Sequence, residues 1–279
     1  MEVSASPKPG LVDRLGSGAH TDMDFSTFLA SITAITPYYC ACAQTGLALE
    51  TVDDTTLSRI RPLGIACEAA MLEATGGVNT HKGAIFSLGI LACAAGYCHG
   101  RLGDLSPATV CACAGVIAAE AVKDFYKPDY LVNPTKGRQL YDAYGIQGIR
   151  GEAASGFASV RRWALPVLEE LEGSGREPEE IHLQALLHLM ANVCDTNVIS
   201  RGGIAGMQYV QDSAQKALEL GGALTPRGKE YLAELDREYI RRNLSPGGCA
   251  DLLSAAILLH RLPALFAPSP NPSPERSAL

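Results

Sequence analysis

Helical segments alternate with charged, glycine-rich connections along nearly the whole chain. Alanine and leucine dominate the long segments, and the alternating Val, Ile and Thr pattern that is typical of strands is nearly absent. Ser-Pro or Thr-Pro pairs at 106–107, 225–226 and 245–246 have the pattern of an N-cap followed by proline at the first helical position. The sequence therefore predicts an all-α fold.

The helical pattern is clear in residues 178–193, where Ile181, Ala185 and Leu189 recur at helical spacing. About ten helices with short connections predict a single compact domain over residues 1–265, with the Gly-rich connections forming the active site. The Pro/Ser-rich tail 266–279 is expected to be disordered. The helices are expected at 25–49 (with Pro37 as a kink or break), 55–74, 82–98, 107–126, 135–144, 152–171, 178–194, 204–220, 226–241 and 247–261.

Charge and hydropathy exclude several classes of protein. The net charge of -7 argues against a broad nucleic-acid surface, although it allows a local basic pocket for a small anion. The longest uncharged runs, 83–98 and 106–119, are shorter than the roughly 20 residues of a membrane span and indicate buried core helices. There is no apolar signal segment, and the nine cysteines form no CxxC pair. We therefore expect a cytoplasmic protein with buried, reduced cysteines and no membrane partner.

Two connections repeat one motif. Asn79 stands three residues before Lys82-Gly83, and Asn133 stands three residues before Lys136-Gly137. The start of a helix favours an anion, and a lysine in the first turn is consistent with a phosphate lying between them. For a single motif, a surface lysine beside an ordinary cap is the simpler interpretation. Arg150-Gly151 and Arg201-Gly202 add two further cations beside glycine, and together they favour a polyphosphate site.

Acidic residues accompany these cations. Asp22, Glu68 and Asp195 are candidate ligands for Mg²⁺, which is commonly held by one or two carboxylates plus substrate phosphates. Each of them could instead be a helix cap or a salt-bridge partner. Of the histidines, His20 and His81 lie in the charged connections. The chain has no GxSxG motif, which favours a reaction between bound substrates over covalent hydrolysis.

Five sequence blocks resemble a known family. The blocks EVSASPKPGLVDRLGSGAHTDMD, GVNTHKGAIFSLGIL, YGIQGIRGEAASGF, DTNVISRGG and NLSPGGCADLL are similar to triphosphoribosyl-dephospho-coenzyme A synthases, from residue 2 to about 260. The resemblance implies an all-helical cytoplasmic transferase. Such an enzyme joins ATP to 3′-dephospho-coenzyme A and releases adenine. Its product is the prosthetic-group precursor for the acyl carrier protein of citrate lyase or malonate decarboxylase, and a separate holo-acyl-carrier-protein transferase attaches it.

This reaction suggests a role for each charged residue. The 2′-hydroxyl of one nucleotide attacks C1′ of the ribose of ATP as adenine leaves. We expect Glu152 to take the hydroxyl proton and His81 to protonate or orient adenine. Mg²⁺ is expected on Asp22, Glu68 or Asp195. The triphosphate is expected to bind Lys8, Arg14, Lys82, Lys136, Arg138, Arg150 and Arg201.

Two positions depart from the family pattern. Only residues 1–7 precede Lys8, where relatives have a helical stretch, so we expect the opening segment to be less firmly held. Relatives can carry the arginine of the TKGRQLY stretch one place later, where this chain has Gln139, which places the role of Arg138 in question. The alternative functions are a Mg²⁺-dependent N-glycosyl hydrolase of an adenine nucleotide and a non-catalytic nucleotide-binding or coenzyme A-binding regulator.

Overall fold

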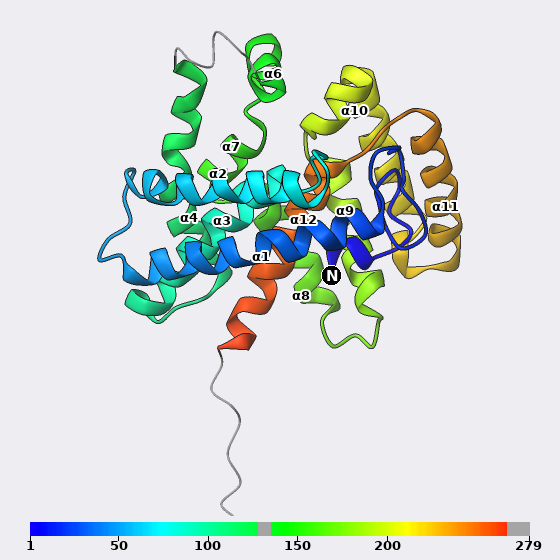
Figure 1. Cartoon of the computed structure of the whole chain (residues 1–279). Coiled ribbons are helices and arrows are strands. Elements are labelled where there is room, and N and C mark those ends of the chain that lie inside the picture. Colours follow the sequence, from blue (N-terminus) through cyan, green and yellow to red (C-terminus); the bar gives the residue numbers. More distant parts are fainter. Residues whose placement is uncertain (128–134, 267–279) are drawn as a thin grey trace, which may run out of the picture.

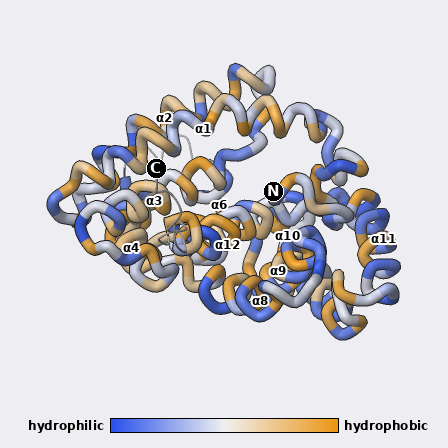
Figure 2. The backbone as a smooth tube through the Cα atoms, turned by 90° about the horizontal axis from the view of Figure 1, so that it is seen from below, coloured by the Kyte–Doolittle hydropathy of each residue, from blue (hydrophilic) through white to orange (hydrophobic). Residues whose placement is uncertain are grey.

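The apolar core is built mainly on helices α3 (Lys82–Tyr97), α4 (Pro107–Lys123), α9 (Pro178–Asn192) and α12 (Gly247–Leu265), and the remaining helices surround them. This computed structural model describes residues 1–127 and 135–266. In Figure 1, α12 passes through the middle of the molecule and α11 lies at its edge. In Figure 2, apolar segments gather around α12, whereas α11 carries more hydrophilic residues.

The described residues form α-helices, short 3₁₀ and π turns, and no strands, so the all-α prediction is confirmed. The α-helices are α1 Phe25–Ala48, α2 Thr56–Ala74, α3 Lys82–Tyr97, α4 Pro107–Lys123, α6 Lys136–Tyr144, α7 Gly148–Ala154, α8 Leu165–Leu171, α9 Pro178–Asn192, α10 Thr196–Glu219, α11 Pro226–Arg241 and α12 Gly247–Leu265. The tail that was expected to be disordered lies, apart from Phe266, outside the described residues.

Two predicted helices differ from the structure. The segment 152–171 is not one helix, because the backbone turns at Phe157, whose φ is 56°, between α7 and α8. The helix predicted from 204 begins earlier, at Thr196, and is interrupted at Gly203, whose φ is 65°. The apolar pattern after residue 203 was therefore read correctly, but the polar first turns that precede it were missed.

Two of the three predicted N-caps are confirmed. The Oγ of Ser106 accepts the N–H of Thr109, and Oγ1 of Thr225 accepts the N–H of Gly228 at 3.1 Å. The prediction for Ser245 was wrong, because α12 begins at Gly247 and Pro246 holds the cap position. Ser245 is instead buried and makes a side-chain hydrogen bond to His20 at 2.9 Å.

Two helical stretches, Lys82–Leu102 and Gly247–Leu265, are long and apolar enough to cross a membrane by length and composition alone. Both belong to the packed core, where Leu91 and Cys93 of the first and Ala255 and Leu259 of the second are fully buried. A core helix of a globular protein has the same composition, so these stretches are weak indications of a membrane span.

The opening segment is packed into the protein, contrary to our expectation that it is less firmly held. Val3, Ala5 and Leu11 are buried, and the N–H of Gly10 donates to Oδ1 of Asp236 at 2.9 Å. Gly10 has a φ of 71°, and a Cβ there would lie 2.2 Å from the carbonyl oxygen of Leu244. Only glycine fits this path, which keeps the opening segment against the loop before α12.

Candidate active site

A single large cavity collects most of the predicted site residues. Its volume is about 1210 Å³, and the opening segment, α1, α2, α3, α6, α7, α10 and α12 all contribute to its walls. Apart from the short helix α7, the first residues of α3, α6, α10 and α12 line it, so the N-termini of four longer helices border one space. The partial positive charge at each of these termini favours an anionic ligand.

One wall of the cavity carries a group of cations around Asp124. This carboxylate is 1% exposed and accepts hydrogen bonds from Arg61 at 2.8 Å and Lys127 at 2.6 Å, with Arg150 at 3.9 Å. Burial would raise the pKa of Asp124, but the hydrogen bonds from Lys127 and Arg61 outweigh it and lower the pKa. Three cations around one carboxylate leave a net positive charge, and two of them, Arg61 and Arg150, line the cavity.

The start of α6 lies beside this cationic group. A Cβ on Gly137 would be 3.8 Å from Nη1 of Arg150, and the exposed Lys136 precedes it. The Oγ1 of Thr135 caps the helix by accepting the N–H of Arg138. The predicted companions Lys136 and Arg150 therefore line the same wall, although Asn133 of the repeated motif lies outside the described residues.

The start of α3 forms a second charged wall. Oδ1 of Asn79 accepts the N–H of Lys82 at 3.1 Å, and the ammonium of Lys82 donates to Oε2 of Glu68 at 2.8 Å. The side chain of Lys82 remains 59% exposed, so it can be reached from the cavity. The Asn-x-x-Lys pattern thus forms a side-chain-to-backbone hydrogen bond at the helix start, while His81 holds the N-cap position.

His81 lies at the same helix start and is held by two hydroxyl groups. Its Nδ1 lies 2.7 Å from Oγ of Ser31 and 3.0 Å from Oγ1 of Thr80. Because Thr80 donates its proton to Ser31, the Thr80 oxygen can only accept from the ring, whereas the Ser31 hydroxyl can donate or accept, and the two contacts together fix the orientation of the ring. Burial and the nearby charge of Lys8 lower the pKa of His81 to about 4, so the ring is neutral at pH 7. A neutral ring offers one donor and one acceptor nitrogen.

Lys8 is buried at the base of the cavity. It is 1% exposed, and its ammonium forms an ion pair with the carboxylate of Glu2. Its backbone N–H donates to Oδ2 of Asp13 at 2.8 Å. The opening segment therefore contributes a paired cation to the site, and its predicted charge is partly neutralised within the protein.

Arg201 lines the cavity from α10. Its guanidinium donates to the carbonyl oxygen of Ala19 at 2.8 Å and to Oδ1 of Asn243 at 2.7 Å. Neither partner is charged, and Arg201 has no ion pair to a carboxylate within the described residues. The positive charge of Arg201 is therefore available to a ligand.

Two predicted cations lie away from the cavity. Arg14 is half-exposed and pairs with Glu179 at 2.7 Å, and Arg138 pairs with Asp142 at 2.7 Å. Neither lines the cavity wall. Their roles in triphosphate binding stay predictions to which the geometry adds no support.

Two predicted acids are tied into the backbone. Asp195 is buried and accepts the N–H groups of Asn197 at 2.8 Å, Val198 at 3.3 Å and Cys249 at 2.8 Å. It thereby caps α10 and links it to the first turn of α12. Burial raises the pKa of Asp195, while these backbone hydrogen bonds oppose the rise.

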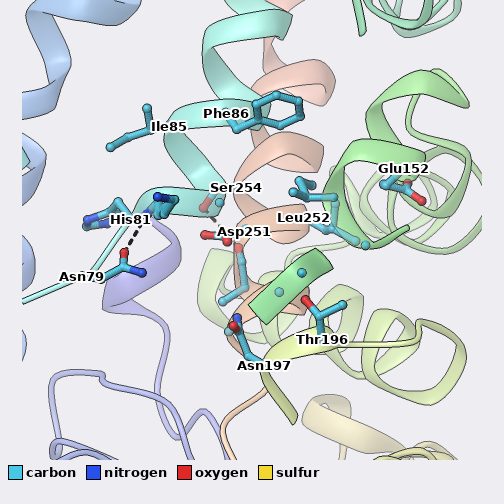
Figure 3. Close-up of a pocket in the computed structure, with 18 of the residues that line it drawn as sticks. Asn79, His81, Ile85, Phe86, Glu152, Thr196, Asn197, Asp251, Leu252 and Ser254 are labelled. Carbon is cyan, nitrogen blue, oxygen red and sulfur yellow. Dashed lines mark hydrogen bonds between the residues drawn. The ribbon is translucent and has the colours of Figure 1, made fainter. Parts of the chain in front are cut away.

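Glu152 has a comparable position at the end of α7. Its Oε1 accepts the N–H of Ser159 at 2.8 Å and that of Val160, and its Oε2 accepts the hydroxyl of Ser159 at 2.8 Å. Arg150, which the sequence placed beside it, is directed toward Asp124 and the ring of Phe125. Glu152 lines the cavity and is labelled in Figure 3, but its oxygens already hold the turn before α8.

The predicted metal ligands do not form a cluster. In residues 1–127 and 135–266, no group of three or more His, Cys, Asp or Glu side chains is arranged to hold a metal ion. Asp22 is exposed and lies 3.7 Å from His20, and Glu68 has one lysine partner. Both keep oxygens that can still bind a cation. This fits Mg²⁺ held by one or two carboxylates and completed by substrate phosphates.

The sequence analysis missed three residues of this site. Arg61 shares a helical face with Ile65 and Glu68 by its i, i+4, i+7 spacing, which was a usable signal. Asp124 gave no signal of its own within AVKDFYK. Asp251, which lines the cavity from α12, lies in the block NLSPGGCADLL but received no role. Figure 3 shows Asp251 between His81 and the start of α10 at Thr196.

Four helix starts and a cationic wall border one cavity in an all-helical protein, an arrangement that favours an anionic ligand. Comparisons with known proteins give the family. A model of the CitG family, ATP:dephospho-CoA triphosphoribosyl transferase, matches residues 1–269.

Relatives with curated names support this match. A probable 2-(5″-triphosphoribosyl)-3′-dephosphocoenzyme-A synthase from Pectobacterium carotovorum is 44% identical over 265 residues, which are 95% of this chain and 86% of the relative. The synthase from Escherichia fergusonii is 42% identical over 264 residues, 94% of this chain and 87% of its own. The chain belongs to the ATP:dephospho-CoA triphosphoribosyl transferase family.

A solved structure of low sequence identity is also similar. The crystal structure of a putative triphosphoribosyl-dephospho-coA synthase from Archaeoglobus fulgidus matches 84% of this chain and 97% of its own, with 18% identity and a TM-score of 0.47.

Proposed function

We propose that this chain transfers the 5-triphosphoribosyl group of ATP to the 2′-hydroxyl of 3′-dephospho-coenzyme A and releases adenine. The family supplies the reaction, and the observation that supports it here is one cavity of about 1210 Å³ bordered by four helix N-termini. Two nucleotides with five phosphate groups between them require both the space and the positive charge.

The cations have separate tasks in this proposal. Arg61, Lys136 and Arg150 at one wall bind the triphosphate of ATP, which is a handle and is not cleaved. Lys82 at the start of α3 and Arg201 on α10 complete the grip from two other walls. Lys8 sets the charge at the base of the cavity through its ion pair with Glu2. Three-sided binding fixes the ribose, so that C1′ faces the acceptor hydroxyl.

Mg²⁺, when bound to Asp22 or Glu68 and to substrate phosphates, would neutralise phosphate charge. Asp195 is a third candidate ligand, although its oxygens already accept three backbone N–H groups. His81, which is neutral at pH 7, forms a hydrogen bond to adenine through Nε2 and orients the leaving base. Glu152 is one candidate for the base, and its hydrogen bonds to Ser159 and Val160 favour a holding role.

The product of this reaction is suited to be the substrate of a further transfer reaction. A triphosphoribosyl-linked dephospho-coenzyme A carries an activated phosphoanhydride, which is suited to attack by a protein hydroxyl. We propose that a separate holo-acyl-carrier-protein transferase consumes it in the cytoplasm, where ATP and reduced cysteines are found. The six buried, unpaired cysteines, at 42, 67, 93, 98, 111 and 249, support a reducing compartment.

Adenine release tests the proposed function. The purified protein is incubated with ATP and Mg²⁺, with and without dephospho-coenzyme A, and free adenine is measured. The proposal requires release only when dephospho-coenzyme A is present. Release with ATP alone would support an N-glycosyl hydrolase, and no release under either condition would support a regulator that only binds.

A further inference from the structure

Asp251 is held against the first turn of α3 by an unusually close approach. A Cβ on Gly83 would lie 2.0 Å from Oδ2 of Asp251, so only glycine leaves room for the carboxylate. The backbone N–H of Ala84, one residue further along, is the donor that favours the charged form of Asp251. The carboxylate thus lies beside a helix N-terminus and faces the cavity that it lines (Figure 3).

The other carboxylates of the cavity have stronger partners. Glu2, Glu68 and Asp124 form ion pairs with lysine or arginine. Asp195 and Glu152 each accept three hydrogen bonds, as described above. In the described part of the chain, Asp251 has no cationic side chain within ion-pair distance, and its one donor is a backbone N–H. It is the cavity carboxylate whose oxygens are least occupied by the protein itself, apart from the exposed Asp22.

The surroundings of Asp251 make it a good proton acceptor. Burial is the largest cause that raises its pKa well above the ordinary value, followed by the negative charges of Glu2 and Asp195. Tyr39 on α1 and Cys249 on α12 are the other titratable groups that interact with it. A carboxylate with a raised pKa is a stronger base than one held by arginine or lysine.

We propose that Asp251 is the general base of the reaction, a conclusion that rests on the proposed transferase function. Its carboxylate takes the proton of the acceptor 2′-hydroxyl as the new bond from that oxygen to C1′ forms. The bond from C1′ to N9 breaks, and its electron pair leaves with adenine. Adenine takes up one proton from solvent, and Asp251 returns its own proton to solvent, so no oxidant or reductant is needed.

Asp251→Asn is the first test. It keeps the size of the side chain and removes the basic oxygen, and a positioned base contributes about 10²–10⁴-fold. Turnover should fall by that factor, while the ATP dissociation constant changes less than about threefold and the melting temperature does not fall. The acidic limb of the wild-type pH profile should be lost in this variant.

Asp236→Asn is the matched control. Asp236 is also partly buried with a raised pKa and a single backbone N–H partner, Gly10, but it does not line the cavity. Asparagine keeps an oxygen that can accept that N–H. Turnover of this control should stay within about threefold of wild type.

Chemical rescue gives a second, independent readout. Asp251→Ala leaves space beside Gly83. Added formate should raise the turnover of this variant at least about tenfold over its turnover without formate. A purely structural residue would lower the melting temperature and would not respond to formate.

Near-normal turnover of Asp251→Asn, in a preparation whose wild type releases adenine with dephospho-coenzyme A, would overturn the proposal and leave the proposed function intact. Loss of turnover together with a lower melting temperature and no formate rescue would also overturn it. A wild type that releases no adenine would refute both.

Discussion

Arg201 and His20, 181 residues apart, are joined by a hydrogen bond of 3.1 Å from the guanidinium to Nδ1 of the ring. Because a guanidinium only donates, Nδ1 accepts, and the ring proton is on Nε2, which donates to Oγ of Ser245 at 2.9 Å. Burial and the charge of Arg201 lower the pKa of His20, against the opposing effect of Asp22. One neutral histidine therefore connects the opening segment, α10 and the loop before α12.

This connection predicts the effect of Arg201→Lys. A lysine cannot reach Ala19, Asn243 and His20 together, because it lacks the planar fork of arginine. We expect the free energy of unfolding to fall by about 1–3 kcal/mol, measured in urea, and amide exchange at residues 10–20 to accelerate. Arg59→Lys, at an exposed position on α2, is the matched control. Equal stability of the two variants would mean that the Arg201 hydrogen bonds contribute nothing to holding the opening segment.

The lowered pKa of His81 predicts an acid-sensitive fold. Its pKa is about 4 in the folded protein and 6.5 as the ordinary value, so the unfolded chain binds the proton first as the pH falls. The stabilising contribution is complete above pH 6.5 and is lost as the pH falls toward 4. The loss amounts to about 2 kcal/mol between pH 7 and pH 5.

The measurement is the unfolding free energy of wild type and His81→Gln at both pH values. The wild type should lose about 2 kcal/mol more than the variant over this interval, because glutamine does not titrate. Parallel losses in the two proteins would show that His81 titrates normally and is accessible to protons in the folded state.

The cavity lysines predict weaker ATP binding without loss of stability. Lys82 is 59% exposed and Lys136 is exposed, so neither supports the core. Each alanine variant should raise the ATP dissociation constant by about 10–150-fold, which corresponds to the roughly 1.5–3 kcal/mol of a charged hydrogen bond. Lys123→Ala is the control, since Lys123 is equally exposed on α4 but lies away from the cavity. ATP binding at wild-type strength in both cavity variants would remove the paired lysines from the triphosphate site.

The hydrogen bonds of Glu152 predict a structural effect of Glu152→Gln. A glutamine has one carbonyl oxygen where Glu152 uses two carboxylate oxygens toward Ser159. We expect the melting temperature to fall, with a loss of about 1–2 kcal/mol, and turnover at saturating ATP to remain within about threefold of wild type. A fall in turnover of 10²–10⁴-fold at an unchanged melting temperature would instead make Glu152 the base.

The sequence predicted the fold well because its signals are local. The caps at Ser106 and Thr225 and the apolar period of α9 depend on residues within a few positions, and the structure confirms them. Ser245 misled the prediction, since its hydroxyl is used by His20, far away in the chain. The break at Phe157 depends on a positive φ in a non-glycine residue, which no local pattern announces.

The site could be predicted only in part, for a related reason. The repeated Asn-x-x-Lys-Gly motif located the helix starts, and these do line the cavity. Which carboxylate accepts hydrogen bonds from the protein, and from which donors, depends on tertiary contacts. Asp195 links α10 to α12, and Asp251 is exposed to the cavity because Gly83 lies beside it. The sequence alone gives no reason to assign different roles to Asp195 and Asp251, and only the packing distinguishes them.

The central claim is that adenine leaves while all three phosphates of ATP stay with the acceptor. The most direct measurement uses ATP labelled with one isotope in adenine and another in the γ-phosphate, incubated with dephospho-coenzyme A and the enzyme. Chromatography and mass spectrometry should find the adenine label in free adenine and the γ-phosphate label, in equal amount, in a single product that contains dephospho-coenzyme A. Phosphate label in free ribose triphosphate would contradict the account. So would adenine label in the product that contains dephospho-coenzyme A.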